Sequence, residues 1–264
     1  MITLIGHGYI GNHIAHELIN QKIPYRWIRH YDDIETAGTT AIINAAGFTG
    51  SPNVDACEIY RQETIDGNVR YPLWVENKAD RIPVVHVSSG CVYTGYKDGG
   101  WTEDDEPNFD FNNGSFYNGS KALAQDLLGP WLLQKSYLLR IRMPFGNYTH
   151  PKNFLTKLEN YEKLIDYRNS LSYTVDVARV AVHFAVNKPE PGIYNVCNPG
   201  SSTTRRIADS MGLNKSWFNE DEFKQATRAP RSNCVLNTDK LQSVFPIQTV
   251  ESALKSAIAS YRND

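Results

Sequence analysis

The feature that most constrains this chain is a short apolar strand that runs directly into a glycine-rich turn. Residues 2–5 read Ile-Thr-Leu-Ile, and residues 6–11 read Gly-His-Gly-Tyr-Ile-Gly. In a G-x-G-x-x-G turn the first glycine makes the tight turn, the second admits a pyrophosphate to the backbone, and the third lets the next helix pack closely on the strand. Such a helix is predicted because Ile10, Ile14 and Leu18 recur at four-residue spacing.

Apolar runs of strand length recur along the chain with helical patterns between them. Strands are predicted at 2–5, 25–28, 40–47, 84–93, 137–142 and 192–196, and long helices at 55–75 and 117–129. Buried strands that alternate with helices indicate a parallel sheet covered on both faces. We therefore predict an α/β fold, with a Rossmann-type doubly wound parallel sheet in residues 1–145. Residues 146–264 should form mainly a smaller, discontinuous C-terminal substrate-binding lobe, with some segments returning to the sheet.

Bulk properties exclude several classes of partner. The 264 residues carry a net charge of -2, which gives no general surface for a nucleic acid. The apolar runs are too short to span a membrane, and the first residues lack the basic and apolar regions of a signal peptide. Cys57, Cys91, Cys197 and Cys234 have neither the spacing of a metal site nor that of a disulfide framework. These features predict a cytoplasmic protein with no membrane, nucleic-acid or metal partner.

Small and polar residues gather where the predicted strands end. The run at 40–47 ends in Asn-Ala-Ala-Gly, which leaves room for a dinucleotide across the sheet edge, and the run at 84–93 ends in side chains that include Ser89 and Cys91. Ligands of open α/β sheets bind outside the carboxyl ends of the strands, so a site is expected here. The polar, glycine-rich loop at 96–113 is long for a connection and is predicted to cover the substrate.

Tyr117 and Lys121 lie four residues apart at the start of a predicted helix, so their side chains share one face. An ammonium beside a phenol stabilises the phenolate and lowers a pKa that starts near ~10. The pair therefore predicts a proton donor at Tyr117, although a tyrosine and a lysine at this spacing also occur in purely structural helices.

Arg29 follows the predicted second strand, where a dinucleotide fold selects its cofactor. A carboxylate at this place binds the ribose 2′-hydroxyl of NAD, whereas an arginine accommodates the 2′-phosphate of NADP. Asp32 and Asp33 come slightly late for the first role. We expect NADPH, with NADH as the alternative; an exposed arginine at the end of a strand is the structural reading.

In this order and spacing, the glycine turn, Asn44–Gly47, Ser89 and Tyr117-x-x-x-Lys121 resemble the extended short-chain dehydrogenase/reductases. The likeness is most specific for the dTDP-4-dehydrorhamnose reductase group, and within it for the plant-type UDP-4-keto-6-deoxyglucose 3,5-epimerase/4-reductases. The blocks that carry this closer likeness lie at 44–58, 89–93, 107–109, 140–144, 153–157 and 229–233. The resemblance implies NAD(P)H-dependent reduction of the C4 ketone of a UDP- or dTDP-linked 4-keto-6-deoxyhexose of a rhamnose-type pathway.

The resemblance also implies roles for single residues. Tyr117 would protonate the C4 oxygen, Ser89 would hydrogen-bond it, and Lys121 would hold the cofactor ribose and depress the Tyr117 pKa. The cofactor would further contact Gly6, Gly8, Tyr9, Ile10, Gly11, Arg29, Asn44, Ala45, Ala46, Gly47 and Pro144. The substrate would contact Thr49, Ser89, Gly90, Cys91, Asn153, Phe154 and Arg231, with Asn153 and Arg231 at the diphosphate.

Cys91 and Lys157 are the residues expected to add a 3,5-epimerase activity. GDP-L-fucose synthases also carry a cysteine two residues after the catalytic serine and use it for epimerisation, and Lys157 is placed as in the plant-type bifunctional enzymes. The C4 ketone acidifies the C3 and C5 hydrogens, and inversion needs a base on one face and an acid on the other. A thiol with a pKa near ~8.5 can play either part. The structural reading makes Cys91 a buried filler and Lys157 a solvated helix residue.

The alternatives on the same fold are a reductase without epimerase activity, another nucleotide-sugar epimerase of the extended family, and a non-catalytic NADP-binding regulatory subunit, as in the beta subunit of methionine adenosyltransferase. A dehydratase typically has Asp-Glu after its catalytic Ser or Thr, whereas this chain has Gly90-Cys91. The presence of Ser89, Tyr117 and Lys121 favours an enzyme. The resemblance implies a homodimer formed through the helices at 55–75 and 117–129, and the nucleotide base and the sugar stay open.

Overall fold

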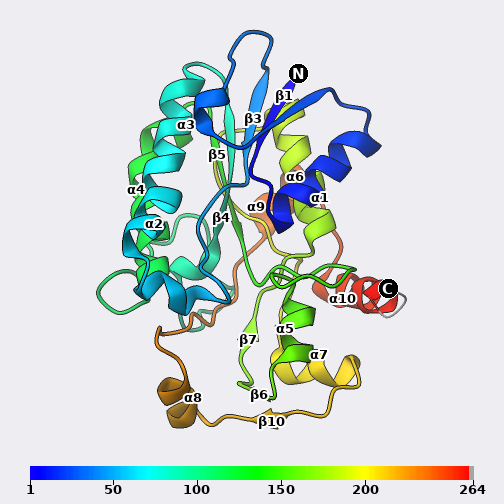
Figure 1. The fold of residues 1–264 in the computed structure, drawn as a ribbon. Coiled ribbons are helices and arrows are strands. Elements are labelled where there is room, and N and C mark those ends of the chain that lie inside the picture. Colours follow the sequence, from blue (N-terminus) through cyan, green and yellow to red (C-terminus); the bar gives the residue numbers. More distant parts are fainter. Residues whose placement is uncertain (262–264) are drawn as a thin grey trace.

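The computed structural model describes residues 1–261. At its centre is a parallel sheet with the strand order β2-β1-β3-β4-β5-β8 (Figure 1). Its strands are β1 Ile2–Ile5, β2 Tyr25–Ile28, β3 Ala41–Asn44, β4 Val84–Ser89, β5 Tyr137–Ile141 and β8 Gly192–Asn195. The predicted doubly wound parallel sheet is confirmed. Because β1 lies between β2 and β3, the strand order reverses there, and the crevice where such folds bind ligands opens at the carboxyl ends of β1 and β3.

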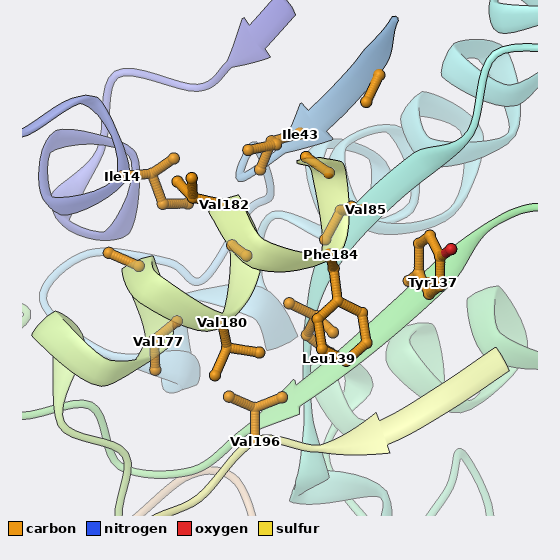
Figure 2. Packing of buried hydrophobic residues seen from close by; sticks show 14 of the residues in the cluster. Ile14, Ile43, Val85, Tyr137, Leu139, Val177, Val180, Val182, Phe184 and Val196 are labelled. Carbon is orange, nitrogen blue, oxygen red and sulfur yellow. The ribbon is translucent and has the colours of Figure 1, made fainter. Parts of the chain in front are cut away.

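Helices cover both faces of the sheet (Figure 1). The main covering helices are α1 Tyr9–Asn20 and α6 Thr174–Asn187 on one face, and α3 Tyr71–Ala79 and α4 Phe116–Leu132 on the other. Figure 2 shows Val180, Val182 and Phe184 of α6 in the cluster that also contains Val85 of β4 and Leu139 of β5. The strands therefore lie between two apolar layers, which is why β1, β3 and β5 are buried along their whole length.

The long helix predicted at 55–75 is broken into pieces. The chain forms a 3-10 turn η2 (Val54–Glu58), a short helix α2 (Arg61–Ile65), a π-helical turn η3 (Asp66–Arg70) and then α3. In the π-helical turn, a Cβ on Gly67 would lie 2.9 Å from the Phe48 Cβ, so only a residue without a side chain allows this approach. Single π-turns of this kind are frequent at functional sites because they redirect one side chain.

The remaining segments form a smaller body below the sheet in Figure 1, with a core of its own. Its elements are α5 Phe154–Asn160, β6 Lys163–Leu164, β7 Arg168–Asn169, β9 Ser202–Thr203, α7 Thr204–Ser210, β10 Ser216–Trp217, α8 Glu220–Ala226 and α10 Val250–Tyr261. β6 pairs with β10, and β7 pairs with β9. α6 and β8 return to the large sheet, and α9 (Asp239–Val244), which was not predicted, contributes Leu241 to the core of the sheet. The predicted division near residue 145 stays a prediction.

Two 3-10 turns complete the described elements, η1 (Tyr31–Asp33) and η4 (Gly90–Val92). Within residues 1–261, each helix is too short or too polar to cross a membrane.

Candidate active site

The three glycines of the first turn have three different surroundings. Gly6 adopts a left-handed φ of +101°, and a Cβ there would lie 2.7 Å from the carbonyl carbon of Ala45. A Cβ on Gly11 would lie 2.0 Å from the Gly6 oxygen, so α1 packs directly on the turn. The space around Gly8 is open, and the N-terminus of α1 behind it has no side-chain cap and no acidic residue in its first turn. The backbone N–H groups at this helix end therefore suit an anion such as a pyrophosphate.

The end of β2 lies beside this turn. His7 stacks on Trp27 with ring centroids 4.4 Å apart, and Trp27 Nε1 donates to the Gly6 oxygen at 3.0 Å. Burial lowers the pKa of His7, and the charge of the exposed Arg29 lowers it further. Arg29 thus lies within electrostatic reach of the glycine turn, but the choice between NADPH and NADH stays a prediction. His7 had no predicted role, although its place inside the turn was a signal.

A buried polar chain fixes the end of β3. Asn44 Oδ1 accepts from the backbone N–H of Ala46 at 3.1 Å, and Asn44 Nδ2 pairs with His86 Nδ1 at 3.1 Å. The other ring nitrogen of His86 lies 3.0 Å from Glu76, and the ammonium of Lys135 lies 2.8 Å from the second oxygen of that carboxylate. Burial raises the pKa of Glu76, but its contacts with His86 and Lys135 outweigh burial and hold the pKa below its usual range. The chain orients the turn at 45–47.

Residues 47–48, which continue that turn, are hydrogen-bonded by Asn68 and lie close to Lys121. The Asn68 amide accepts from the N–H of Phe48 at 2.9 Å and donates to the Phe48 oxygen at 2.9 Å and to Ser120 Oγ at 3.0 Å. A Cβ on Gly47 would lie 3.4 Å from Lys121 Nζ. Asn68, from the π-helical turn η3, therefore holds residues 47–48 in place beside the ammonium of Lys121.

β4 ends at Ser89, so the strand predicted to reach residue 93 stops earlier and gives way to η4. The cause is local: Ser89 Oγ accepts from the N–H of Cys91 at 3.2 Å and caps the turn. Helix α4 begins after Ser115, whose hydroxyl accepts from the N–H of Asn118 at 3.1 Å. Asn118 Nδ2 donates to the Cys91 oxygen at 2.7 Å. These bonds fasten the first turn of α4 to the turn that carries the thiol.

Tyr117 and Lys121 share one face of α4, with Lys121 Nζ 5.7 Å from the centroid of the Tyr117 ring. Their pKa values differ from the expectation that Lys121 would depress the Tyr117 pKa. Burial raises the pKa of Tyr117 well above its usual value, and a hydrogen bond from Ser89 lowers it by less. Burial also lowers the pKa of Lys121 to about 8, since the residue is only 6% exposed. The loss of hydration is the largest cause of both pKa shifts, so Tyr117 holds its proton at neutral pH.

Cys91 is buried, and Lys157 is half-buried. Burial raises the pKa of the Cys91 thiol, while Ser89, Arg142 and Lys121 lower it. Burial lowers the pKa of Lys157 to about 8, and the charges of Lys152 and Arg231 lower it further. Lys157 is therefore not the solvated helix residue of the structural reading.

Arg231 is held by a carboxylate that had no predicted role. Its two terminal nitrogens donate to the two oxygens of Asp55 at 2.9 and 2.8 Å, and Asp55 also accepts from the N–H of Ala229 at 2.8 Å. On the same side, the ammonium of Lys152 donates to Thr49 Oγ1 at 2.9 Å. Lys152 also escaped prediction, although it adjoins the block at 153–157.

Asn153 caps helix α5. Its side chain is fully buried and bonds to the backbone of Gly146, Tyr148 and Leu155, which caps α5. Its own N–H donates to the His150 oxygen at 2.8 Å. The polar groups of Asn153 are therefore all bonded within the protein, and its contact with the diphosphate stays a prediction.

The other predicted contacts lie around the same edge. Tyr9 begins α1 and stacks on His150 with ring centroids 4.5 Å apart, so the glycine turn touches the segment after β5. Pro144 is half-buried, and its oxygen accepts from the N–H of Phe154 at 2.9 Å. Gly90 is buried against Leu236, and a Cβ there would lie 2.5 Å from a methyl carbon of the leucine, which would have to shift.

The loop at 96–113, predicted to cover the substrate, is anchored at its base. Trp101 stacks on Tyr93 with ring centroids 5.0 Å apart. Its backbone N–H donates to the Val235 oxygen at 2.9 Å, and its backbone oxygen accepts from the N–H of Asn237 at 2.8 Å. Its role over the substrate stays a prediction.

Comparison with known proteins gives consistent likenesses over almost the whole chain. Residues 29–263 match the protein family described as RmlD substrate binding domain. The bifunctional dTDP-4-dehydrorhamnose 3,5-epimerase/dTDP-4-dehydrorhamnose reductase of Arabidopsis thaliana is 34% identical over 229 residues, which cover 81% of this chain and 74% of the plant protein.

Two solved structures have the same fold. The UDP-rhamnose synthase from Acanthamoeba polyphaga mimivirus has a TM-score of 0.90 at 26% identity, with 98% of this chain and 99% of the viral chain covered. The dTDP-4-dehydrorhamnose reductase from Bacillus anthracis, solved in complex with NADP, has a TM-score of 0.77 at 17% identity and covers 98% and 97% of the two chains. At that identity the second likeness concerns the fold alone.

Proposed function

The chain belongs to the RmlD substrate binding domain family, and from this premise we propose that it is an NAD(P)H-dependent nucleotide-sugar oxidoreductase. It reduces the C4 ketone of a UDP- or dTDP-linked 4-keto-6-deoxyhexose of a rhamnose-type pathway. One observation carries the proposal. Tyr117 and Lys121 share a face of α4, with Lys121 below Gly47 and Tyr117 in contact with Ser89, at the edge where β1, β3 and β4 end.

A dinucleotide fits the residues at the carboxyl end of β1. The uncapped N-terminus of α1 and the open space at Gly8 suit its pyrophosphate, and Arg29 suits the 2′-phosphate of NADPH, with NADH as the alternative. Lys121 would hold the ribose. When bound, the nicotinamide supplies the hydride that reaches C4.

Tyr117 supplies the proton of the reduction. Its raised pKa keeps the phenol neutral until negative charge develops on the C4 oxygen, to which it then gives its proton. The Ser89 hydroxyl donates a hydrogen bond to the same oxygen. Lys121, whose pKa is about 8, is mostly cationic at pH 7 and stabilises the phenolate that remains.

Cys91 and Lys157 would perform the 3,5-epimerisation. The ketone at C4 acidifies C3–H and C5–H, Cys91 acts on one face of the sugar, and Lys157 acts on the other. The pKa of Lys157, about 8, suits proton transfer near neutral pH because the group can both hold and release a proton there.

The nucleotide diphosphate would bind beside Arg231, Lys152 and Lys157. These groups lie close enough for Lys152 and Arg231 to lower the pKa of Lys157. Asp55 holds the guanidinium of Arg231 through its two terminal nitrogens, and the N–H groups that Asp55 and Ala229 do not bind can donate to phosphate oxygens.

The proposal includes a homodimer formed through the face that α2, α3 and α4 present. Trp74, Leu123 and Leu127 on this face are 44%, 36% and 41% exposed. Light scattering on Leu127→Asp should show a monomer, while Ile19→Asp on α1, at the other face of the sheet, should leave the dimer intact. A dimeric Leu127→Asp protein would contradict this interface.

We also infer that the protein works in the cytoplasm, where its cysteines, buried and free in the structure, stay reduced. Fractionation of the source cells tests this inference, which recovery of the protein in a membrane or secreted fraction would contradict.

The decisive test is one reaction with NADPH and UDP-4-keto-6-deoxyglucose in D2O, read by NMR, alongside the dTDP-linked ketone. A reduced L-sugar with deuterium at C3 and C5 establishes both activities, and Cys91→Ser should then abolish deuterium incorporation. Reduction without exchange leaves a reductase alone. NADPH that binds without being consumed by either ketone would favour the non-catalytic regulatory subunit.

A further inference from the structure

Arg142 is a buried arginine that the mechanism above does not use. It follows β5 and is 6% exposed. One terminal nitrogen donates to Asn169 Oδ1 and, at 3.1 Å, to the Ser232 oxygen, whereas Nε is buried without a hydrogen-bond partner. Within residues 1–261 no carboxylate forms an ion pair with its guanidinium. An unpaired buried cation is destabilising, so its retention calls for an anion that forms beside it.

The side chain of Arg142 runs directly beneath the turn that carries Cys91. A Cβ on Gly90 would lie 3.2 Å from both Cγ and Cδ of Arg142. The backbone of Arg142 is fixed on both sides by Ser172, with bonds of 2.9 Å to its N–H and 2.8 Å to its oxygen. Burial raises the pKa of Cys91 and of Tyr117, and the charge of Arg142 lowers both.

Arg142 differs from Lys121, the other cation near the Cys91 thiol, in that its charge does not titrate. The polar groups that face Cys91 are Ser89 from β4, Tyr117, Asn118 and Lys121 from α4, and Arg142 from the end of β5. Lys121 has a pKa of about 8 and therefore loses its charge as a thiolate becomes populated. A guanidinium keeps its charge throughout this pH range.

We propose that Arg142 is a positioning residue for epimerisation, and that its guanidinium is the fixed counter-charge of the Cys91 thiolate. The inference rests on the epimerase role proposed for Cys91. The thiol proton leaves to water. The thiolate then takes the proton from C3 or C5: an S–H bond forms, the C–H bond breaks, and its electron pair moves into an enolate with its charge on the C4 oxygen. The ammonium of Lys157 gives a proton to the opposite face, so that an N–H bond breaks, a C–H bond forms and the ketone returns. Water then restores the proton to the Lys157 amine.

Two measurements on Arg142→Met and Arg142→Lys test the proposal. The first titrates the thiolate of Cys91 by its absorbance at about 240 nm without substrate, as the difference between each protein and the same protein with Cys91→Ser. The second compares deuterium exchange into UDP-4-keto-6-deoxyglucose with NADPH-dependent reduction of the already epimerised ketone. Cys197→Ser is the matched control, because Cys197 also lies in the field of Arg142 but has no proposed role. Arg142→Gln replaces Arg142→Met if that variant does not fold.

In Arg142→Met the thiolate midpoint should rise by about one pH unit or more, and exchange should fall about tenfold further than reduction. Arg142→Lys, which keeps a cation, should shift the midpoint less. An unchanged midpoint, or equal losses of exchange and reduction, would show that Arg142 serves only to tether Asn169 and Ser232. If the unaltered protein shows no exchange, the epimerase proposal fails by itself, and the substrate-free titration still decides whether Arg142 stabilises the thiolate.

Discussion

Gly8 and Gly11 lie three residues apart, yet alanine should damage different properties at the two positions. A Cβ on Gly11 would lie 2.0 Å from the Gly6 oxygen, about 1 Å closer than real contacts allow, whereas the space at Gly8 is open. Overpacking of this kind costs about 1–3 kcal/mol, and alanine regains about 0.5–1 kcal/mol over glycine inside a helix. Taking the middle of each range, the expected net loss for Gly11→Ala is about 1 kcal/mol, or a fall in Tm of about 2–4 °C for a chain of this size.

Gly8→Ala should unfold almost as the unaltered protein does, because its φ of -88° and ψ of -171° suit alanine. Its methyl group would instead occupy the approach of the pyrophosphate and weaken NADPH binding about tenfold or more, which is about 1.4 kcal/mol. Urea unfolding without cofactor measures the first property, and titration of NADPH fluorescence measures the second. Unimpaired NADPH binding by Gly8→Ala, or full stability of Gly11→Ala, would refute this account of the turn.

Tyr117→Phe should retain NADPH binding but lose about 10²–10⁴-fold in the rate of ketone reduction, because the proton donor is gone. NADPH fluorescence measures the binding and stopped-flow oxidation of NADPH measures the rate; a loss of rate below tenfold would count against Tyr117. Lys121 has a pKa of about 8 and is cationic below it, so reduction should fall about tenfold between pH 7 and pH 9, and a flat profile would contradict this role. Glu76→Gln should lower the free energy of unfolding at pH 7 by about 3 kcal/mol, since it breaks a buried ion pair. Because the pKa of Glu76 is lowered in the folded protein, its ionised form stabilises the fold above its unfolded pKa of about 4.3, and this stabilisation is lost as the pH falls further. The free energies of unfolding of the variant and of the unaltered protein, measured in urea, should therefore converge in acid.

Features that depend on local sequence could be predicted from it. The glycine turn could be predicted because its spacing, and its place between an apolar strand and an amphipathic helix, are local features of the sequence. Tyr117 and Lys121 could be paired because helical spacing alone puts them on one face. The strand at 84–93 shows the limit of this reasoning. Its apolar run begins at Val84 and apolar residues return at Val92, but the Ser89 hydroxyl accepts from the N–H of Cys91 and ends the strand early.

Features that depend on the folded surroundings were missed or misjudged. Asp55 and Arg231 are 176 residues apart in sequence, so no local pattern could pair them. The direction of the Asn153 side chain is set by the carbonyl groups of Gly146 and Tyr148, which turn back toward it only in the folded loop. The pKa of Tyr117 was expected to fall because a lysine is nearby, but the desolvation that raises it is a property of the whole packed site.

Reduction and epimerisation require opposite protonation behaviour from two groups in the same site. Reduction needs a phenol that keeps its proton until charge appears on the C4 oxygen, and burial helps because it raises the pKa of Tyr117. Epimerisation needs a thiol that can lose its proton, and the same burial opposes this by raising the pKa of Cys91. Deeper burial of the site would keep the proton on Tyr117 and would also keep it on Cys91, so burial alone cannot adjust the pKa values of both groups as the two reactions require. A fixed positive charge close to the thiol meets both requirements if it lowers the pKa of Cys91 more than that of Tyr117. Arg142 is placed for this, because its side chain packs against Gly90, the neighbour of Cys91.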